Sequence, residues 1–124
     1  MSVPNILIAE DNQGTANMLK ILLELEGYQV STVQESQLVL SALEQQCPDV
    51  MLLDFHLGYE DAAGLLQSIR SRPEFEQLPI VVISGMELSW EAEEAGADVF
   101  LLKPFGADEL FVAMREAMSR HQSH

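Results

Sequence analysis

The chain has 124 residues, the length of one ordinary domain, which is enough to bury a hydrophobic core. It carries 20 acidic residues against 6 lysines and arginines, and its net charge of −14 argues against direct binding to nucleic acid or to an anionic membrane surface. No apolar run approaches the length of a transmembrane helix, and the N-terminus lacks a signal-peptide pattern. A single cysteine, Cys47, cannot form an internal disulfide, so we expect a reducing, cytoplasmic setting.

The first part of the chain alternates between short apolar runs and helical patterns. Residues 5–9 (Asn-Ile-Leu-Ile-Ala) are mostly apolar and predict a buried strand, after which Asn12 is expected to N-cap a helix. Residues 28–33 alternate and contain β-branched side chains, which predicts a second strand at the edge of a sheet. Ser36 is expected to cap the next helix, which continues to about residue 46.

The alternation continues to the last helix. Residues 49–54 (Asp-Val-Met-Leu-Leu-Asp) contain four consecutive apolar residues, which predicts a strand buried on both faces. After it we expect an irregular loop and a helix to about residue 72, a strand at 79–83, a short helix at 88–95, a strand at 99–102 and a helix at 107–120. This order predicts an α/β fold, in which a five-stranded parallel sheet has helices on both faces.

Chemically capable side chains follow the ends of four of these strands. Glu10 and Asp11 follow the first strand, Asp54 ends the third, Ser84 follows the fourth, and Lys103 follows the fifth. Because ligands of open α/β sheets bind outside the carboxyl ends of the strands, we expect these side chains to meet at one site.

Three neighbouring carboxylates favour a divalent cation. Two carboxylates about 4 Å apart repel by roughly 4 kcal/mol at an effective dielectric of about 20, and a cation relieves that repulsion. Oxygen ligands favour Mg²⁺, which binds through one or two carboxylates plus phosphate oxygens. No group of histidines and cysteines in the sequence has the spacing of a zinc site, which argues against zinc. A lysine and a hydroxyl opposite the cation suit a phosphoryl group, and Asp54 is the candidate nucleophile.

These residues resemble the conserved set of response-regulator receiver domains in two-component signalling. Glu10-Asp11, Asp54, Ser84 and Lys103-Pro104-Phe105 stand in that family's register, and the likeness covers essentially the whole chain, so we expect one receiver domain over residues 1–124 with no effector domain. The resemblance implies the flavodoxin-like strand order 2-1-3-4-5. It also implies a signalling domain rather than an enzyme in the usual sense.

The resemblance implies a partner and a metal ion. A histidine kinase or histidine phosphotransfer protein would supply the phosphoryl group, meeting the rim formed by Gly14, Thr15, Met18 and Pro104-Phe105. Asp54 would accept the group. Mg²⁺ would be bound directly by Asp11, Asp54 and the backbone carbonyl of His56, with Glu10 acting mainly through water.

The remaining site residues would carry the switch. By resemblance, Lys103 would pair with the phosphoryl oxygens and Ser84 would move to hydrogen-bond the phosphoryl group. Phe100 stands where the family has an aromatic residue that changes rotamer with that movement. The Lys103-Pro104 bond is expected to be cis.

Two features depart from the family pattern. Gly58 stands where a proline is usual, which bears on loop rigidity and on the lifetime of the phosphorylated form. The segment between Ser84 and Lys103 is shorter than usual by most of a helical turn. The missing turn falls in the fourth helix, part of a surface through which many receivers dimerise, so a homodimer stays an open alternative and Trp90 could mark a modified surface.

Other function classes fit parts of the sequence. The main alternative is a receiver-like interaction module that is not phosphorylated. Asp54-Phe55-His56 is also similar to the start of the cobalamin-binding signature Asp-x-His-x-x-Gly, although Tyr59 stands in the place of its glycine. A phosphohydrolase of the haloacid dehalogenase type would need a second aspartate at the position of His56. Neither of these enzyme or cofactor classes explains Lys103-Pro104.

Overall fold

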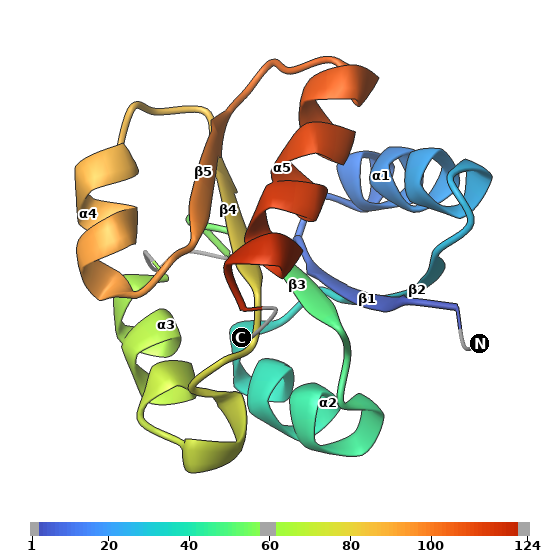
Figure 1. The fold of residues 1–124 in the computed structure, drawn as a ribbon. Coiled ribbons are helices and arrows are strands. Elements are labelled where there is room, and N and C mark those ends of the chain that lie inside the picture. Colours follow the sequence, from blue (N-terminus) through green and yellow to red (C-terminus); the bar gives the residue numbers. More distant parts are fainter. Residues whose placement is uncertain (1–2, 58–61, 122–124) are drawn as a thin grey trace.

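The computed structural model describes residues 3–57 and 62–121. Five parallel strands form one sheet in the order β2-β1-β3-β4-β5, which confirms the expected fold and strand order (Figure 1). The strands are β1 Asn5–Ala9, β2 Gln29–Val33, β3 Val50–Asp54, β4 Ile80–Ser84 and β5 Val99–Leu102. The helices are α1 Gln13–Leu25, α2 Val39–Gln46, α3 Ala63–Arg70, α4 Ser89–Ala95 and α5 Ala107–Arg120, and short 3₁₀ turns cover Ser36–Leu38 and Pro73–Phe75.

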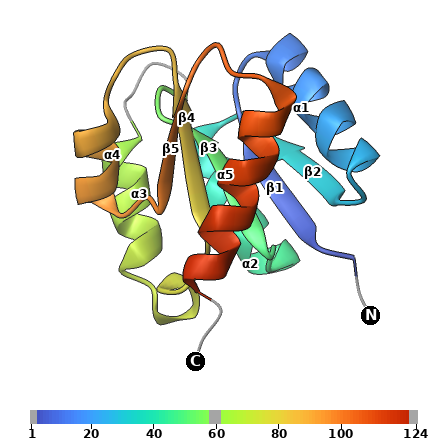
Figure 2. The same ribbon diagram turned by 45° about the horizontal axis from the view of Figure 1, so that its top comes forward.

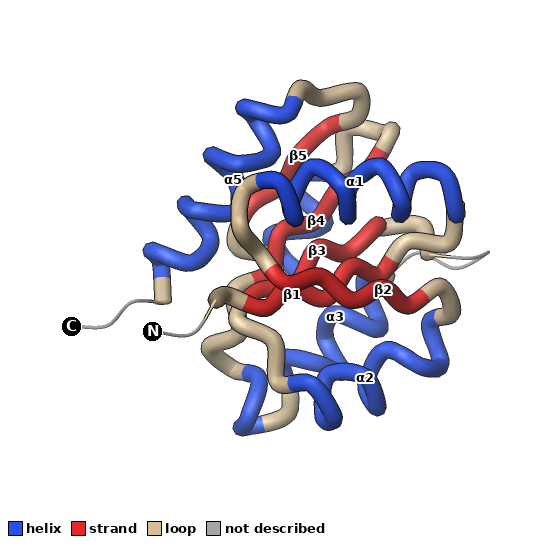
Figure 3. The backbone as a smooth tube through the Cα atoms, turned by 90° about the vertical axis from the view of Figure 1, so that its right-hand side faces the viewer, coloured by secondary structure: helices blue, strands red, loops and turns tan. Residues whose placement is uncertain are grey.

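The helices cover both faces of the sheet. On one face α1 and α5 pack against side chains such as Ile8 and Leu52, and on the other α2, α3 and α4 pack against side chains such as Leu7 and Leu53. Figures 2 and 3 show the same division, with α1 and α5 on one side and α2 and α3 on the other. All five residues of β3 are buried, as the unbroken apolar run predicts for a central strand. Among the described residues, no helix is long and apolar enough to cross a membrane.

Of the two predicted helix caps, one is confirmed and one is wrong. Asn12 does cap α1, since its side chain accepts a hydrogen bond from the backbone N–H of Thr15. Ser36, however, caps nothing: it lies inside the 3₁₀ turn, whose N-cap is Glu35, and the α-helix begins only at Val39. A residue that is already helical cannot direct its hydroxyl at the free N–H groups of the first turn.

The third helix ends earlier than we predicted, at Arg70 rather than near residue 72. Arg72 is extended, with φ −88° and ψ 127°, which is the backbone conformation that the following Pro73 favours. Gly58 and Tyr59, on which two of the sequence arguments rested, lie outside the described residues.

A polar cluster at the amino ends of the strands joins three elements. Arg70 donates hydrogen bonds to the carbonyl groups of Gly96, Phe75 and Leu78, and its guanidinium lies 3.0 Å from Asp98. The ring of His121 lies 2.8 Å from the same carboxylate, so the end of α5 is attached to the loop before β5. This cluster stands at the opposite edge of the sheet from the strand ends that carry Glu10 and Asp54.

Candidate phosphoacceptor site

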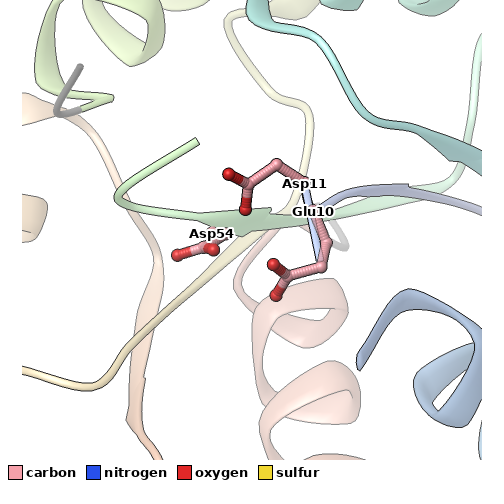
Figure 4. A group of neighbouring side chains, drawn as sticks. All are labelled: Glu10, Asp11 and Asp54. Atoms are coloured by element: carbon pink, nitrogen blue, oxygen red, sulfur yellow. The ribbon is translucent and has the colours of Figure 1, made fainter. Parts of the chain in front are cut away.

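The three predicted acidic residues meet at the carboxyl edge of the sheet, as Figure 4 shows. Glu10 and Asp11 directly follow β1, and Asp54 is the last residue of β3, which lies beside β1 in the sheet. One carboxylate oxygen from each residue lies within 4.8 Å of the other two. Glu10 and Asp54 are buried, with 1% and 6% of their surfaces exposed, whereas Asp11 is exposed.

Lys103 adds a positive charge beside these carboxylates. Its Nζ lies 3.2 Å from Oε1 of Glu10 and 3.8 Å from Oδ2 of Asp54. The backbone N–H of Lys103 donates to the carbonyl of Ser84 across β4 and β5, and the Lys103–Pro104 peptide bond is cis, as expected. The structure therefore brings together the carboxylates and the ammonium that follow three different strands.

Ser84 is fully buried at the end of β4. Its Oγ accepts a hydrogen bond from the backbone N–H of Met86 at 3.0 Å and lies 3.4 Å from Nδ1 of His56. The hydroxyl is thus held by its own loop and by the His56 ring. The ring contact was not predicted, because the sequence assigned His56 a role only through its backbone.

The backbone around His56 also contributes to the site. Its N–H donates to Oδ1 of Asp54 at 3.1 Å, so the two oxygens of that carboxylate have different neighbours: Oδ1 has the His56 amide and Oδ2 has Lys103. The His56 ring meets the ring of Phe55 edge-on, with centroids 6.0 Å apart. These contacts fix the carboxylate and the first residues of the loop relative to one another.

Burial changes the acid–base behaviour of Glu10. Desolvation raises the pKa of Glu10 from 4.5 to about 7, and a hydrogen bond and like charge from Asp54 act in the same direction. The backbone N–H of Asn12, which donates to Oε2 at 3.1 Å, and the ammonium of Lys103 lower the pKa but do not offset the burial. The site therefore holds more negative charge than its surroundings can easily neutralise.

The donor set fits a hard divalent cation. It consists of carboxylate oxygens from three residues with no histidine or cysteine among them, and oxygen-only sites of this kind favour Mg²⁺ over zinc. A cation there would also favour the ionised form of Glu10 and so lower its raised pKa. The three carboxylates of the expected cation site therefore lie together.

Phe100 lies in β5, half-buried, and packs against the core cluster on the face covered by α4, together with Leu88 and Ala97. That position is compatible with packing and with a switch, so the rotamer change stays a prediction.

Comparisons with known proteins agree with this arrangement. The chain matches the family of the response regulator receiver domain over residues 6–115. The regulatory protein KdpE of Escherichia coli is 34% identical over 122 residues, and the phosphate regulon regulatory protein PhoB of Rhizobium meliloti is 30% identical over 121 residues. These alignments cover 96% and 95% of the chain but 53% of each relative, so the chain spans about half the length of these curated relatives.

Solved structures show the same fold. A putative response regulator from Chloroflexus aurantiacus superposes with a TM-score of 0.91 at 28% identity, covering 96% of this chain and 100% of that one. The chemotaxis response regulator CheY4 of Vibrio cholerae superposes with a TM-score of 0.86 at 20% identity, covering 94% and 99% of the two chains, and shows likeness in fold. With acids, hydroxyl and lysine at the strand ends and the family match over most of its length, the chain belongs to the response regulator receiver domains of two-component signalling.

Proposed function

We propose that Asp54 accepts a phosphoryl group from a phosphohistidine of a histidine kinase or histidine phosphotransfer protein. A carboxylate oxygen of Asp54 would form the new P–O bond while the P–N bond of the phosphohistidine breaks and the imidazole leaves. The observation that carries the proposal is the position of this carboxylate, which is buried at a strand end with the Lys103 ammonium 3.8 Å away. Water would later hydrolyse the acyl phosphate and return Asp54 to its starting state.

We further propose that Asp11, Asp54 and the backbone carbonyl of His56 hold Mg²⁺, with Glu10 acting through water. The proximity of the three carboxylates supports this assignment. When bound, the cation neutralises charge on the carboxylates and on the phosphoryl oxygens. Glu10 and Asp54 can then remain ionised side by side.

Lys103 and Ser84 would respond to the phosphoryl group. Lys103 now lies nearest to Glu10, and pairing with a phosphoryl oxygen would move its ammonium toward Asp54. Ser84 would exchange its contact with His56 for a hydrogen bond to the phosphoryl group, drawing the loop after β4 inward. The change would shift a two-state equilibrium and with it the affinity for a downstream partner.

The surface next to the site suits a helical phosphodonor. Met18, Ile21 and Leu25 are exposed apolar residues spaced along one side of α1, which begins beside the acidic site. Such a stripe can pack against an apolar helix of a kinase or phosphotransfer domain. This stripe supports the expectation that the rim formed by Gly14, Thr15, Met18 and Pro104–Phe105 is the docking surface. The single free cysteine fits a cytoplasmic place for this exchange.

The alternative, an interaction module that is not phosphorylated, is less well supported, because every residue that the chemistry requires is present. The discriminating experiment is incubation with acetyl phosphate and Mg²⁺, read by intact mass. Gain of one phosphoryl group by the wild type, absent in Asp54→Asn and in samples with excess chelator, supports the proposal. An unchanged wild-type mass would favour the inert module.

A further inference from the structure

The strand β2 forms an open edge of the sheet. It stands at one end of the strand order, and among the described residues it pairs only with β1. In Figure 3 the helix α1 lies above β2 and α2 lies below it, one on each face of the sheet. Gln29 and Thr32 are exposed, and Val30 and Ser31 are half-buried. The strand is therefore accessible from the side that faces away from β1.

Two residues of β2 direct their backbone groups away from the sheet. The N–H of Gln29 and the carbonyl of Val33 form hydrogen bonds with the residues that flank β1, so every second residue counted from Gln29 faces β1. Val30 and Thr32 stand between them, and their N–H and C=O groups have no partner in residues 3–57 and 62–121. The edge therefore offers two donors and two acceptors to another strand.

This edge lacks the usual protection against pairing with another chain. Edge strands of soluble proteins commonly carry a charged side chain, a proline or a bulge that prevents such pairing. Residues 28–34 contain no charged residue and no proline, although the chain has 20 acidic residues. Glu26 and Glu35 lie just beyond this segment, where solvent and salt screen them. A second copy can therefore approach β2 without burying a charge.

We propose that two copies of this chain associate through β2, as antiparallel edge strands related by a two-fold axis at Ser31. Ser31 is the middle residue of the strand. Val30 of one copy then lies opposite Thr32 of the other, and each such pair exchanges two N–H···O bonds, which uses every outward group of the strand. The pairing involves no residue of the phosphoacceptor site, so failure of either proposal leaves the other standing.

The side chains are compatible with this register. Val30 packs on the face covered by α1, and there Val30 and Thr32 form cross-strand pairs of β-branched residues. On the other face the two Ser31 side chains meet at the axis, where a small residue leaves room. A groove of about 310 Å³ lies beside the second half of β2 and is lined by Thr32, Val33, Gln34, Glu35 and Leu38. The first half of the partner strand would lie next to this groove, where the exposed Leu38 offers apolar surface.

Disulfide trapping tests the register directly. In an antiparallel pair that is not hydrogen-bonded the Cα atoms are about 4.5 Å apart, which a disulfide can span. In a Cys47→Ser background, which removes the only native thiol, Ser31→Cys should form a disulfide-linked dimer in a glutathione redox buffer. Gln29→Cys is the matched control, because the two copies of residue 29 would lie about 14 Å apart.

The control also tests for random collisions, which favour the more exposed residue 29. Faster cross-linking of Ser31→Cys than of Gln29→Cys supports the proposal. Equal rates, faster cross-linking of Gln29→Cys, or no cross-linking of Ser31→Cys would overturn it.

Sedimentation velocity measures the association of the unphosphorylated protein. From about 1 μM to about 1 mM the wild type should show a reversible monomer–dimer equilibrium. Ser31→Glu places two like charges at the axis and should raise the dimer dissociation constant roughly tenfold, whereas Ser31→Gln, which has nearly the same shape, should change it less than about threefold. Gln67→Glu adds the same charge at an exposed position on α3 and should also have a small effect.

Circular dichroism confirms that each variant is folded. A wild type that stays monomeric over the whole range would overturn the proposal, and so would equal losses of association in Ser31→Glu and Gln67→Glu.

Discussion

The ammonium of Lys103 lies closer to Glu10 than to Asp54, at 3.2 Å against 3.8 Å. In this state the cation stabilises the most deeply buried carboxylate of the site rather than the proposed phosphoacceptor. A phosphoryl group on Asp54 would provide a second, more strongly charged partner for the same ammonium. Under the proposed function, Lys103 would report the phosphorylated state by changing the partner that it contacts.

Lys103→Ala is expected to leave the fold intact and to accept a phosphoryl group, but without the structural response. The wild type should show amide shift changes in the loop after β4 and in β5 on phosphorylation, and the variant should lose most of them. Lys20→Ala is the matched control, because Lys20 is the only other lysine in the chain and lies on α1. A response in Lys103→Ala equal to that of the control would contradict the assigned role.

Glu10 should make stability depend on pH. Its folded-state pKa is raised to about 7 from 4.5, so between these values the unfolded chain releases a proton that the folded protein keeps. The stability that Glu10 contributes is therefore present below pH 4.5 and lost as the pH rises through 7. The loss is on the order of 3 kcal/mol without added metal.

Glu10→Gln removes this effect. Urea unfolding at a series of pH values should show the wild type losing free energy of unfolding relative to Glu10→Gln as the pH rises from 4 to 8. Excess Mg²⁺ should reduce the difference, because a cation favours the ionised carboxylate. Parallel curves for the two proteins in the absence of metal would show that Glu10 is not held protonated by burial.

The contact between Ser84 and His56 should oppose the switched state. Replacing His56 with leucine removes the ring partner of the Ser84 hydroxyl and keeps the backbone carbonyl assigned to the metal. Because a hydrogen bond contributes about 1 kcal/mol net, His56→Leu should bind the phosphoryl analogue beryllofluoride roughly fivefold more tightly with Mg²⁺ present. Titration calorimetry measures the constant.

A double-mutant cycle that combines His56→Leu with Ser84→Ala supplies the control. In that background His56→Leu should have little further effect on beryllofluoride affinity, because the hydroxyl that it releases is absent. The same gain with and without Ser84 would show that the His56 ring acts by some other means.

Arg70 should be important for stability at the opposite edge of the sheet. Arg70→Ala removes a hydrogen-bond donor from four carbonyl groups, those named above and that of Glu76, and leaves Asp98 without its main counter-charge. The expected loss is about 3 kcal/mol in free energy of unfolding, measured by urea denaturation. Arg120→Ala removes an exposed pair with Glu116 on the same face of a helix and should cost less than about 0.5 kcal/mol. Similar losses in the two variants would contradict this account.

The sequence was sufficient for the fold and for the convergence of the site. Strands ending on Glu10, Asp54, Ser84 and Lys103 must share an edge if they are parallel, and the family resemblance supplied the strand order that makes them neighbours. It was not sufficient for side-chain contacts that depend on rotamers, such as the His56 ring beside Ser84.

The arginine cluster could not be predicted for a related reason. Arg70, Asp98 and His121 belong to separate elements, and no local pattern marks them as partners. Ser36 is the opposite case, because a local pattern predicted a cap that the structure does not have. The residue has good capping chemistry but lies one position too far into the helical turn.

Locating the acyl phosphate tests the central claim most directly. Borohydride reduces an aspartyl phosphate to homoserine, so protein treated with acetyl phosphate and Mg²⁺ can be reduced, digested and mapped by mass spectrometry. The account predicts homoserine at position 54 and nowhere else. Homoserine at Asp11, or none in a sample whose mass shows one phosphoryl group, would contradict it.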